Sequence, residues 1–300
     1  MEFSIVIPVR NRPDALRRVL SGIRDAAPPA APFEVLVVDN GSTDSTARVA
    51  EAFDARLLHE PVPNRCRARN LGAREALGRW VVFIDSDCVP RPDWLQKLER
   101  AIAACPPAER VGMVAGRILA APAPSPVGQY IDHRKWIDQE KFLTPGRRYH
   151  SPFAATANLA VRREVYLELG GLDPALPYSG EDADLCWRFA EAGWRIRYAP
   201  EAEVIHEHRA TLRGLWGQAW DYGNGQADLF AKWRVQWRAR SWIEAHHYVW
   251  ALKGLLKTPW RLALGCTPLE RREPFYDFVA NTALALGRAR GGLRHKIWVI

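Results

Sequence analysis

The stretch WVVFIDSD, residues 80–87, runs from five apolar residues directly into an acidic turn. An uninterrupted apolar run rich in β-branched and aromatic residues is typical of a strand buried on both faces, as in a parallel sheet covered by helices. Such sheets bind their ligands at the carboxyl ends of the strands. Asp85 and Asp87 follow this run, and they are therefore the first candidates for a functional site.

Similar apolar runs occur on both sides of this stretch and alternate with helical patterns. Strands are expected at 3–9, 33–39, 55–59, 80–85 and 111–119. Helices are expected near 13–26, 45–53, 67–77 and 92–104. Strands that alternate with helices in this way predict an α/β fold with a mostly parallel sheet flanked by helices.

The composition restricts the class of protein. A chain of 300 residues can bury a sizeable core, and 48% hydrophobic with 25% charged residues is ordinary for a globular protein. Five scattered cysteines without a C-x-x-C pair argue against a disulfide framework or a zinc site and favour a reducing cytosol. The N-terminus leads straight into a strand without a basic segment, and no apolar run is long enough to span a bilayer. We therefore expect a cytoplasmic protein.

The charge is distributed unevenly. Residues 1–208 carry 27 basic and 28 acidic side chains, whereas residues 209–300 carry 15 basic and 6 acidic ones with eight of the 13 tryptophans. This shift predicts a domain boundary near residue 208, with a basic, Trp-rich helical region over 209–300. Tryptophan with Lys and Arg on amphipathic helices is typical of a segment that binds peripherally to the inner face of an anionic membrane. A helical subdomain packed on the preceding domain explains the same composition, so both interpretations stay open. No nucleic-acid motif occurs, and no nucleic-acid partner is expected.

The acidic pair suggests a metal. Two carboxylates at positions i and i+2 repel each other unless they diverge or a cation lies between them. Hard divalent ions such as Mn²⁺ and Mg²⁺ bind carboxylate oxygens together with substrate phosphates. The sequence contains neither GxxxxGK[ST] nor GxGxxG, so bound phosphates would be held by a metal and arginines rather than by a glycine-rich loop.

A second acidic cluster, Glu181, Asp182 and Asp184, begins a helical pattern in YSGEDADLCWRF, residues 178–189. Asp182 shares a helical face with Leu185, Cys186 and Phe189, and this face is predicted to be buried. Asp184 is expected on another face, paired with Arg188 at i+4, and Glu181 is favoured by the helix dipole. From this motif alone, a helix cap and a catalytic carboxylate both explain Asp182.

Four motifs in this order resemble the inverting nucleotide-sugar glycosyltransferases of family 2, which have the GT-A fold. They are VIPVRNRP (6–13), VVDNGSTD (37–44), ARNLGAREALGRWVVFIDSD (68–87) and the segment 162–208, which contains GEDADL and ends in AEVIHEH. The resemblance covers roughly residues 3–208. It implies metal-dependent transfer of a sugar from a nucleoside-diphosphate sugar to a hydroxyl of a glycan, lipid-linked or peptide acceptor. It also implies a GT-A catalytic domain over 1–208, with a nucleotide-sugar half at about 1–119 and an acceptor half at about 120–208.

The resemblance assigns roles to individual residues. Those implied to bind the nucleotide are Pro8, Arg10, Asp39, Arg69, Asn70 and Asp85. Asp87 and His206 would hold Mn²⁺ or Mg²⁺, and Asp182 would be the catalytic base. Supporting positions are Glu181, Asp85 and His208. A strand through AEVIHEH would place both histidines on one face, and the register of the family motif selects His206.

Two other functions are considered. A nucleotidyltransferase on a similar α/β sheet would use a nucleoside triphosphate, and the missing glycine-rich basic phosphate loop argues against it. A catalytically inactive binding protein would act through its basic C-terminal region. The intact acids Asp39, Asp85, Asp87 and Asp182 argue against this second alternative.

Overall fold

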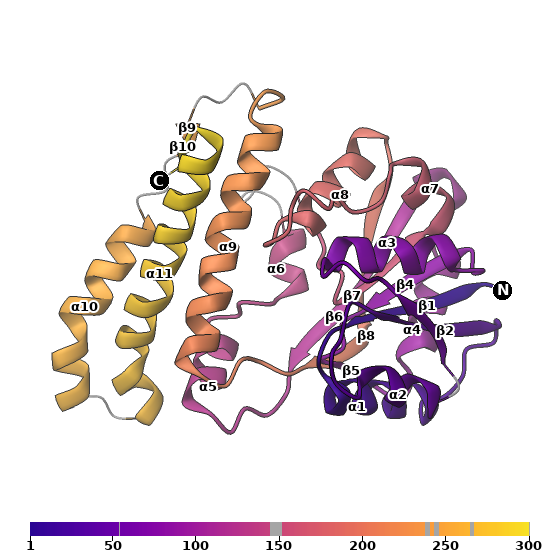
Figure 1. Ribbon diagram of the computed structural model, residues 1–300, viewed down its shortest axis with the longest axis horizontal. Helices are drawn as coiled ribbons and strands as arrows, with labels where there is room; N and C mark the ends of the chain where they lie inside the picture. Colours follow the sequence, from indigo (N-terminus) through magenta and orange to yellow (C-terminus); the bar gives the residue numbers. More distant parts are fainter. Residues whose placement is uncertain (54, 145–151, 238–240, 243–245, 265–266, 300) are drawn as a thin grey trace. The chain divides into compact units, whose positions relative to one another are not determined.

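The computed structural model describes all residues except 54, 145–151, 238–240, 243–245, 265–266 and 300 (Figure 1). The chain divides into two compact units. The first comprises residues 1–121, 137–175 and 181–207, and the second comprises 122–136, 176–180 and 208–300. The functional roles predicted for a catalytic domain over 1–208, for its two halves and for a C-terminal region over 209–300 stay predictions.

The first unit is built on one eight-stranded sheet with the order β3-β2-β1-β4-β7-β6-β8-β5. Its strands are β1 (Phe3–Val9), β2 (Phe33–Asp39), β3 (Arg56–His59), β4 (Trp80–Ile84), β5 (Cys88–Pro90), β6 (Val111–Ala120), β7 (Asn158–Arg162) and β8 (Arg195–His206). The strands β3, β2, β1 and β4 run parallel, and so do β6 and β8. β7 runs antiparallel between β4 and β6. The predicted α/β class with a mostly parallel sheet is confirmed.

Helices cover both faces of this sheet. In Figure 1, α3, α7 and α8 lie above the sheet, and α1 and α2 lie below it. The helical segments are α1 (Pro13–Arg24), α2 (Thr46–Glu51), α3 (Arg65–Glu75), α4 (Trp94–Ala103), the 3₁₀ turn η1 (Pro107–Glu109), α6 (Gln139–Leu143), α7 (Arg163–Glu168) and α8 (Glu181–Glu191). Because the sheet is covered on both faces, all five residues of β4 are buried, as the unbroken apolar run predicted.

The short strand β5 was not predicted from the sequence. It pairs antiparallel with the end of β8, so that Cys88 lies opposite His206. The backbone N–H of Glu207 also donates to the carbonyl of Asp87, at 2.9 Å. A strand of three residues is too short to show a periodic pattern in the sequence. β5 becomes recognisable only in the structure, through its pairing with β8. Its consequence is local: it brings Asp87 next to the end of β8.

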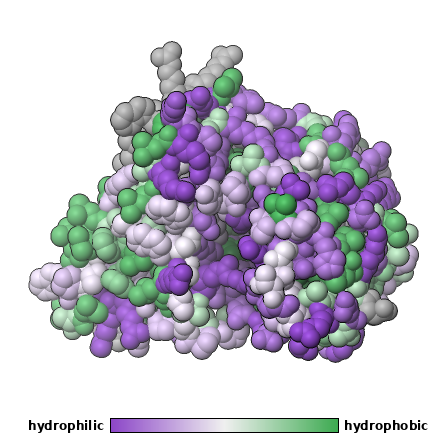
Figure 2. All heavy atoms as spheres, viewed as in Figure 1, coloured by the Kyte–Doolittle hydropathy of each residue, from purple (hydrophilic) through white to green (hydrophobic). Residues whose placement is uncertain are grey.

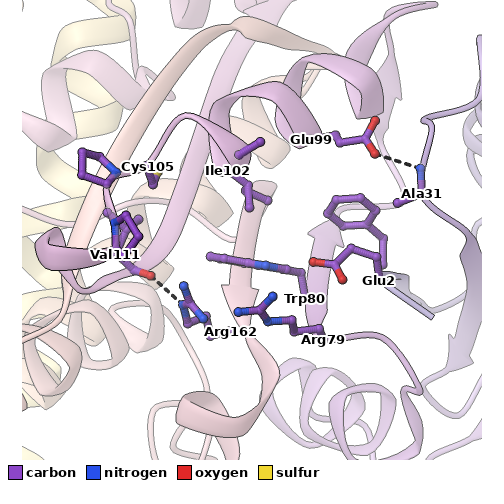
Figure 3. Close-up of a pocket in the computed structure, with 13 residues that line it drawn as sticks. Glu2, Ala31, Arg79, Trp80, Glu99, Ile102, Cys105, Val111 and Arg162 are labelled. Atoms are coloured by element: carbon purple, nitrogen blue, oxygen red, sulfur yellow. Dashed lines mark hydrogen bonds between the residues drawn. The ribbon is translucent and has the colours of Figure 1, made fainter.

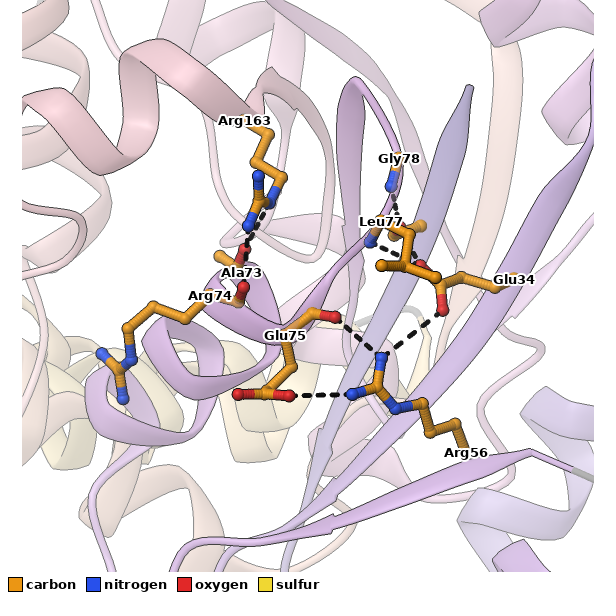
Figure 4. Close-up of polar contacts among 9 residues, drawn as sticks. Glu34, Arg56, Ala73, Arg74, Glu75, Leu77, Gly78 and Arg163 are labelled. Carbon is orange, nitrogen blue, oxygen red and sulfur yellow. Dashed lines mark hydrogen bonds and ion pairs between the residues drawn. The ribbon is translucent and has the colours of Figure 1, made fainter. Parts of the chain in front are cut away.

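Helix α3 is fixed at both ends by polar side chains. At its start, the Asn64 side chain accepts hydrogen bonds from the N–H groups of Cys66 and Arg67. At its end, three carbonyls accept from guanidinium groups (Figure 4). Arg163 donates to the carbonyls of Ala73 and Arg74 at 2.9 and 2.8 Å, and Arg56 donates to that of Glu75 at 2.8 Å. Cations at a helix C-terminus also interact favourably with the helix dipole. This helix carries Arg69 and Asn70.

Arg163→Met is expected to lower the free energy of unfolding by about 1–2 kcal/mol, because two helix-end carbonyls lose a charged donor. The exposed Arg74 on the same helix is the matched control, and Arg74→Met should change stability by less than about 0.5 kcal/mol. Urea unfolding followed by circular dichroism measures both values. Equal midpoints for the two variants would show that the guanidinium contacts of Arg163 add nothing.

The second unit is helical. It contains α5 (Pro126–His133), α9 (Leu212–Trp233), α10 (His246–Leu264), α11 (Pro268–His295) and the short paired strands β9 (Ser241–Trp242) and β10 (Trp298–Val299). α9 and α11 approach each other closely through glycines, since a Cβ on Gly223 would lie 2.1 Å from the Leu284 carbonyl oxygen. Thr267 and Glu270 form a capping box at the start of α11, with Pro268 as the first helical residue.

α10 contains an internal proline, because the helix continues through Pro259 to Leu264. A proline inside a helix removes one backbone donor and leaves a carbonyl without its partner. Pro259 and Leu255 are exposed, so water can solvate the carbonyl that loses its partner. None of the helices in the described part of the chain combines the length and apolar content that a bilayer crossing requires.

Candidate active site

The polar residues that follow β1, β2 and β4 gather at the carboxyl edge of the parallel strands. Asp39 ends β2 and is 6% exposed. Its Oδ1 accepts from the N–H of Ser42 at 3.1 Å, and its Oδ2 lies 3.5 Å from Nδ1 of His59 at the end of β3. The neighbouring Glu60 is also buried and pairs with Arg67 at 3.2 Å. His59 and Glu60 thus join Asp39, and neither was selected from the sequence.

Asp85 pairs with a buried arginine. The Nη2 atom of Arg69, which is 5% exposed, donates to Oδ1 of Asp85. Burial by itself lowers the pKa of Arg69, but the carboxylates around it raise this pKa overall. They belong to Asp85, Asp182 and Glu181. Arg69 therefore stays charged, pairs with Asp85, and interacts electrostatically with the acids at the start of α8.

Asp87 lies between an arginine and a histidine. Its Oδ2 is 2.8 Å from Nη1 of Arg12, and its Oδ1 is 3.7 Å from Nε2 of His206. The pairing of β5 with β8 produces this arrangement. The sequence had selected Arg10, which is exposed beyond β1, whereas Arg12 is the residue that reaches Asp87. Only the turn after β1, where Asn11 has a positive φ of 51°, decides which arginine points to the acids.

The donor atoms of Asp87, Cys88 and His206 all lie within 4.8 Å of one another, close enough to hold a metal ion. Cys88 is fully buried, and burial raises the pKa of its thiol well above the ordinary value. A thiolate is a soft ligand that suits zinc or copper, so Cys88 is a poor ligand for Mn²⁺ or Mg²⁺. Asp87 and His206 remain, and an oxygen with an imidazole nitrogen suits Mn²⁺ better than a soft metal. The donor set therefore fits the divalent ion that the sequence predicted.

Asp182 is the second residue of α8 and follows Gly180 and Glu181. The residue as a whole is half-buried, but its Oδ1 atom is fully buried and has no hydrogen-bond partner. The Thr156 hydroxyl donates a hydrogen bond to the Asp182 carboxylate, which favours the ionised form. Burial raises the pKa of Asp182 to about 7, the Glu181 carboxylate adds to this rise, and Arg69 opposes it. A buried, incompletely paired carboxylate with such a pKa is suited to exchange a proton near neutral pH.

The predicted faces of this helix are wrong in one respect. Glu181 and Asp184 were expected to avoid the buried side, but they are 4% and 0% exposed. Each is buried with a cationic partner: Arg65 lies 3.3 Å from Glu181, and Arg188 lies 2.8 Å from Asp184. The Asp184–Arg188 pair itself was predicted, and it is confirmed. It is buried because Arg188 also donates to the carbonyls of Leu169 and Gly171, contacts that helical spacing cannot reveal.

The remaining residues that the sequence selected lie near the strands and helices described above. Pro8 is half-buried in β1, opposite Val38. The Asn70 side chain donates to the Leu172 carbonyl at 2.7 Å and accepts from the Leu172 N–H at 2.9 Å, so it ties α3 to the segment after α7. β8 ends at His206, so His208 lies beyond the strand, and the predicted common face for the two histidines is wrong. The nucleotide-binding roles of Pro8, Arg10 and Asn70 and a metal-binding role of His208 stay predictions.

A cavity of about 450 Å³ lies elsewhere in this unit (Figure 3). Its lining includes Glu2 and Phe3 at the start of β1, Trp80 at the start of β4, and Arg79 and Arg162. These residues mark the amino ends of the parallel strands. Ligands of open α/β sheets bind at the opposite, carboxyl ends. We therefore place the candidate active site at the cluster of Asp85, Asp87 and Asp182 rather than in this cavity.

The family described as glycosyl transferase family 2 matches residues 4–170, more than half of the chain. The chain belongs to this family. Pre-mycofactocin glycosyltransferase of Mycobacterium tuberculosis is 34% identical to this family 2 chain over 234 residues, which is 76% of this chain and 47% of the relative. The chain thus spans about half the length of that relative. Glycosyltransferase AglE of Haloferax volcanii is 28% identical over 85% of this chain and 82% of its own length.

Solved structures confirm the predicted GT-A fold for this family 2 chain. The mannosyltransferase PcManGT from Pyrobaculum calidifontis, in complex with GDP-Man and Mn²⁺, matches 98% of this chain and 75% of its own length, with a TM-score of 0.57 and 20% identity. Glucosyl-3-phosphoglycerate synthase from M. tuberculosis, in complex with Mn²⁺, UDP-glucose and phosphoglyceric acid, matches 76% of this chain and 78% of its own length. Its TM-score is 0.54 and its identity 22%.

Proposed function

We propose that the protein is a metal-dependent, inverting glycosyltransferase that moves a sugar from a nucleoside-diphosphate sugar to an acceptor hydroxyl. The observation that carries this proposal is the position of Asp182 at the start of α8, where a half-buried carboxylate with one unpaired oxygen interacts electrostatically with Arg69, the partner of Asp85. A carboxylate in this position supports the role of proton acceptor, and membership of family 2 supports sugar transfer as the reaction.

The donor nucleotide is proposed to bind along the carboxyl ends of β1, β2 and β4. Asp39 has a carboxylate suited to accept from an N–H donor of the base, and His59 lies beside it. Asp85 is proposed to lie near the ribose, held in place by Arg69. Arg12 can approach the diphosphate, since its guanidinium already faces an anionic group.

Asp87 and His206 are proposed to hold Mn²⁺ or Mg²⁺. When bound, the ion would neutralise the negative charge that develops on the leaving diphosphate. Support comes from the donor atoms of the two residues, which face each other at 3.7 Å. Two structures of similar fold contain Mn²⁺ with a nucleotide sugar.

Asp182 is proposed as the general base. Inversion requires one displacement at the anomeric carbon, in which the acceptor hydroxyl attacks opposite the leaving group and gives up its proton. The carboxylate of Asp182 is half-buried and therefore partly accessible, so it can accept this proton, and its raised pKa keeps its proton affinity high. Glu181 is held by Arg65 and contributes negative charge beside the base.

The acceptor is proposed to be a glycan, a lipid-linked molecule or a peptide, used in the cytoplasm. The relatives named above are glycosyltransferases, one of them named for pre-mycofactocin, and this supports an acceptor of biosynthetic origin.

Thermal unfolding in the presence of UDP, GDP, dTDP and CDP, each with and without Mn²⁺, tests the donor proposal. The matching nucleotide at 100 times its dissociation constant should add about 2.7 kcal/mol of stability, and mainly when Mn²⁺ is present. Stabilisation by nucleoside triphosphates alone, with release of pyrophosphate, would favour the nucleotidyltransferase alternative. No stabilisation by any nucleotide would favour the inactive binding protein.

A further inference from the structure

Helix α10 presents its small residues inward and its large apolar residues outward. His247, Ala251, Gly254 and Thr258 recur at helical spacing and form the narrow stripe that is at least half-buried. Gly254 faces α11, and a Cβ at this position would lie 2.5 Å from the carbonyl oxygen of Pro274. The stripe therefore packs backbone against backbone and leaves most of the circumference of α10 uncovered.

The uncovered part is strongly apolar. Exposed large side chains on α10 include Leu252, Leu255, Leu256, Trp260, Leu262 and Leu264. Leu256 is 63% and Trp260 is 70% exposed. Figure 2 shows these apolar residues gathered at the left, where Figure 1 places α10. A helix of a water-soluble bundle has the opposite pattern, with its apolar side chains toward the core. Contiguous exposed apolar surface of this kind marks an interaction site.

A basic flank borders the apolar face. Lys253, Lys257 and Arg261 follow one another at i, i+4 and i+8, so they lie on one line along the helix, and all three are exposed. The segment 246–264 contains no Asp or Glu. Trp250 lies within this flank, 5.9 Å from Nζ of Lys253 and 5.4 Å from the guanidinium carbon of Arg134. The occupant of the face must therefore combine an apolar interior with negative charge at its edge.

We propose that α10 lies flat in the interface of an anionic lipid bilayer and holds the protein on the membrane surface. Its leucines and Trp260 enter the boundary between headgroups and acyl chains, while the lysines and Arg261 contact lipid phosphates. A second copy of the chain fits this face less well, because a two-fold interface along α10 would bring equal basic flanks toward each other. The inference goes beyond the sugar-transfer reaction and does not depend on it.

The basic, Trp-rich region had two interpretations, a membrane-binding segment and a packed subdomain. Under this proposal each applies to different helices of the region. α9 and α11 bury residues along their contact, including Ala219 and Ala283, and behave as a packed subdomain. α10 alone provides the membrane-binding face. Peripheral binding should therefore depend on a few side chains of α10 and not on the whole basic charge of residues 209–300.

Sedimentation of the purified full chain with phosphatidylcholine vesicles that contain about one quarter phosphatidylglycerol tests the proposal. The protein should bind at low salt, bind several-fold more weakly at high salt, and bind weakly to pure phosphatidylcholine. Leu255→Ser with Leu256→Ser should reduce the partition coefficient at least about tenfold, since two leucines lose their transfer into lipid. Lys253→Gln with Lys257→Gln should reduce it by about 30-fold at low salt, from about fivefold for each charge.

Matched controls use equally accessible residues elsewhere. Leu293→Ser removes a leucine that is 82% exposed on α11, and Arg48→Gln with Arg100→Gln removes two exposed charges from the first unit. Both controls should bind vesicles as the unchanged protein does. Equal binding by the Leu255/Leu256 variant would overturn the proposal. It would also be overturned if the protein ignored vesicles and instead formed a dimer, seen by analytical ultracentrifugation, that the same variant dissociates.

Discussion

Asp182→Asn is expected to lower sugar transfer per folded molecule by at least about 10²–10⁴-fold, the range attributed to general base catalysis. Asparagine keeps the shape of the side chain but cannot accept the proton of an attacking hydroxyl. Nucleotide and metal binding should be retained, because Asp85 and Asp87 keep their own partners, Arg69 and Arg12. The measurement is turnover normalised to the fraction of molecules that bind nucleotide.

The pH dependence of stability separates this role from a helix cap. Because burial raises the folded-state pKa of Asp182 to about 7, the folded protein binds more protons than the unfolded chain above the ordinary pKa of 3.8. The stability that this group contributes is thus present at acidic pH and is lost as pH rises toward about 7. Asp182→Asn removes that loss, so the variant should be at least as stable as the unchanged protein at neutral pH. Loss of a helix cap would instead cost about 1 kcal/mol.

The same pKa predicts that transfer by the unchanged protein rises with pH up to about 7, because the base must be deprotonated. Asp184→Asn is the matched control on the same helix. Asp184 is fully buried and paired with Arg188, so its loss should lower stability by about 1–3 kcal/mol with turnover per folded molecule unchanged. Near-full transfer by Asp182→Asn, or loss of chemistry in Glu181→Gln alone, would show that the base has been misassigned.

Asp87→Ala is expected to abolish the Mn²⁺-dependent part of nucleotide binding. It removes the carboxylate that faces both His206 and Arg12, and one donor cannot hold a divalent ion at the diphosphate. The stabilisation of about 2.7 kcal/mol expected at 100 times the dissociation constant should disappear, whereas metal-independent binding remains. Isothermal titration with the selected nucleoside diphosphate, with Mn²⁺ and with a chelator, measures both contributions.

Three further variants check the ligand set. His206→Ala should weaken Mn²⁺-dependent binding strongly, and His208→Ala should leave it unchanged. Cys88→Ser should also leave it unchanged, because a soft sulfur ligand contributes little to the binding of a hard ion such as Mn²⁺. If His208→Ala weakens metal binding and His206→Ala does not, then the register of the histidines is wrong. Full Mn²⁺-dependent binding by Asp87→Ala would place the metal elsewhere.

Much of the fold could be predicted because its signals are local. β1 and β2 were predicted with their observed bounds, and α1 to α4 with ends that differ by a few residues. Apolar runs, helical periodicity and caps such as that of Thr267 act within a few residues, and a sequence displays them directly. Strand β5 was missed because a strand of three residues is too short to show a periodic pattern.

The sequence by itself determined the α/β class, the carboxyl-edge acids Asp85 and Asp87, and the acidic start of α8, since each follows from residue order. The tertiary structure alone decided which partners these acids have. It brought Arg12 to Asp87 through the turn after β1, placed His206 beside Asp87 through β5, and buried Glu181 and Asp184 by giving each an arginine. The physical reason is that the burial and pairing of a charge depend on groups distant in the chain. The outward apolar face of α10 was decided in the same way, because Gly254 packs against α11 and turns the leucines toward the surroundings.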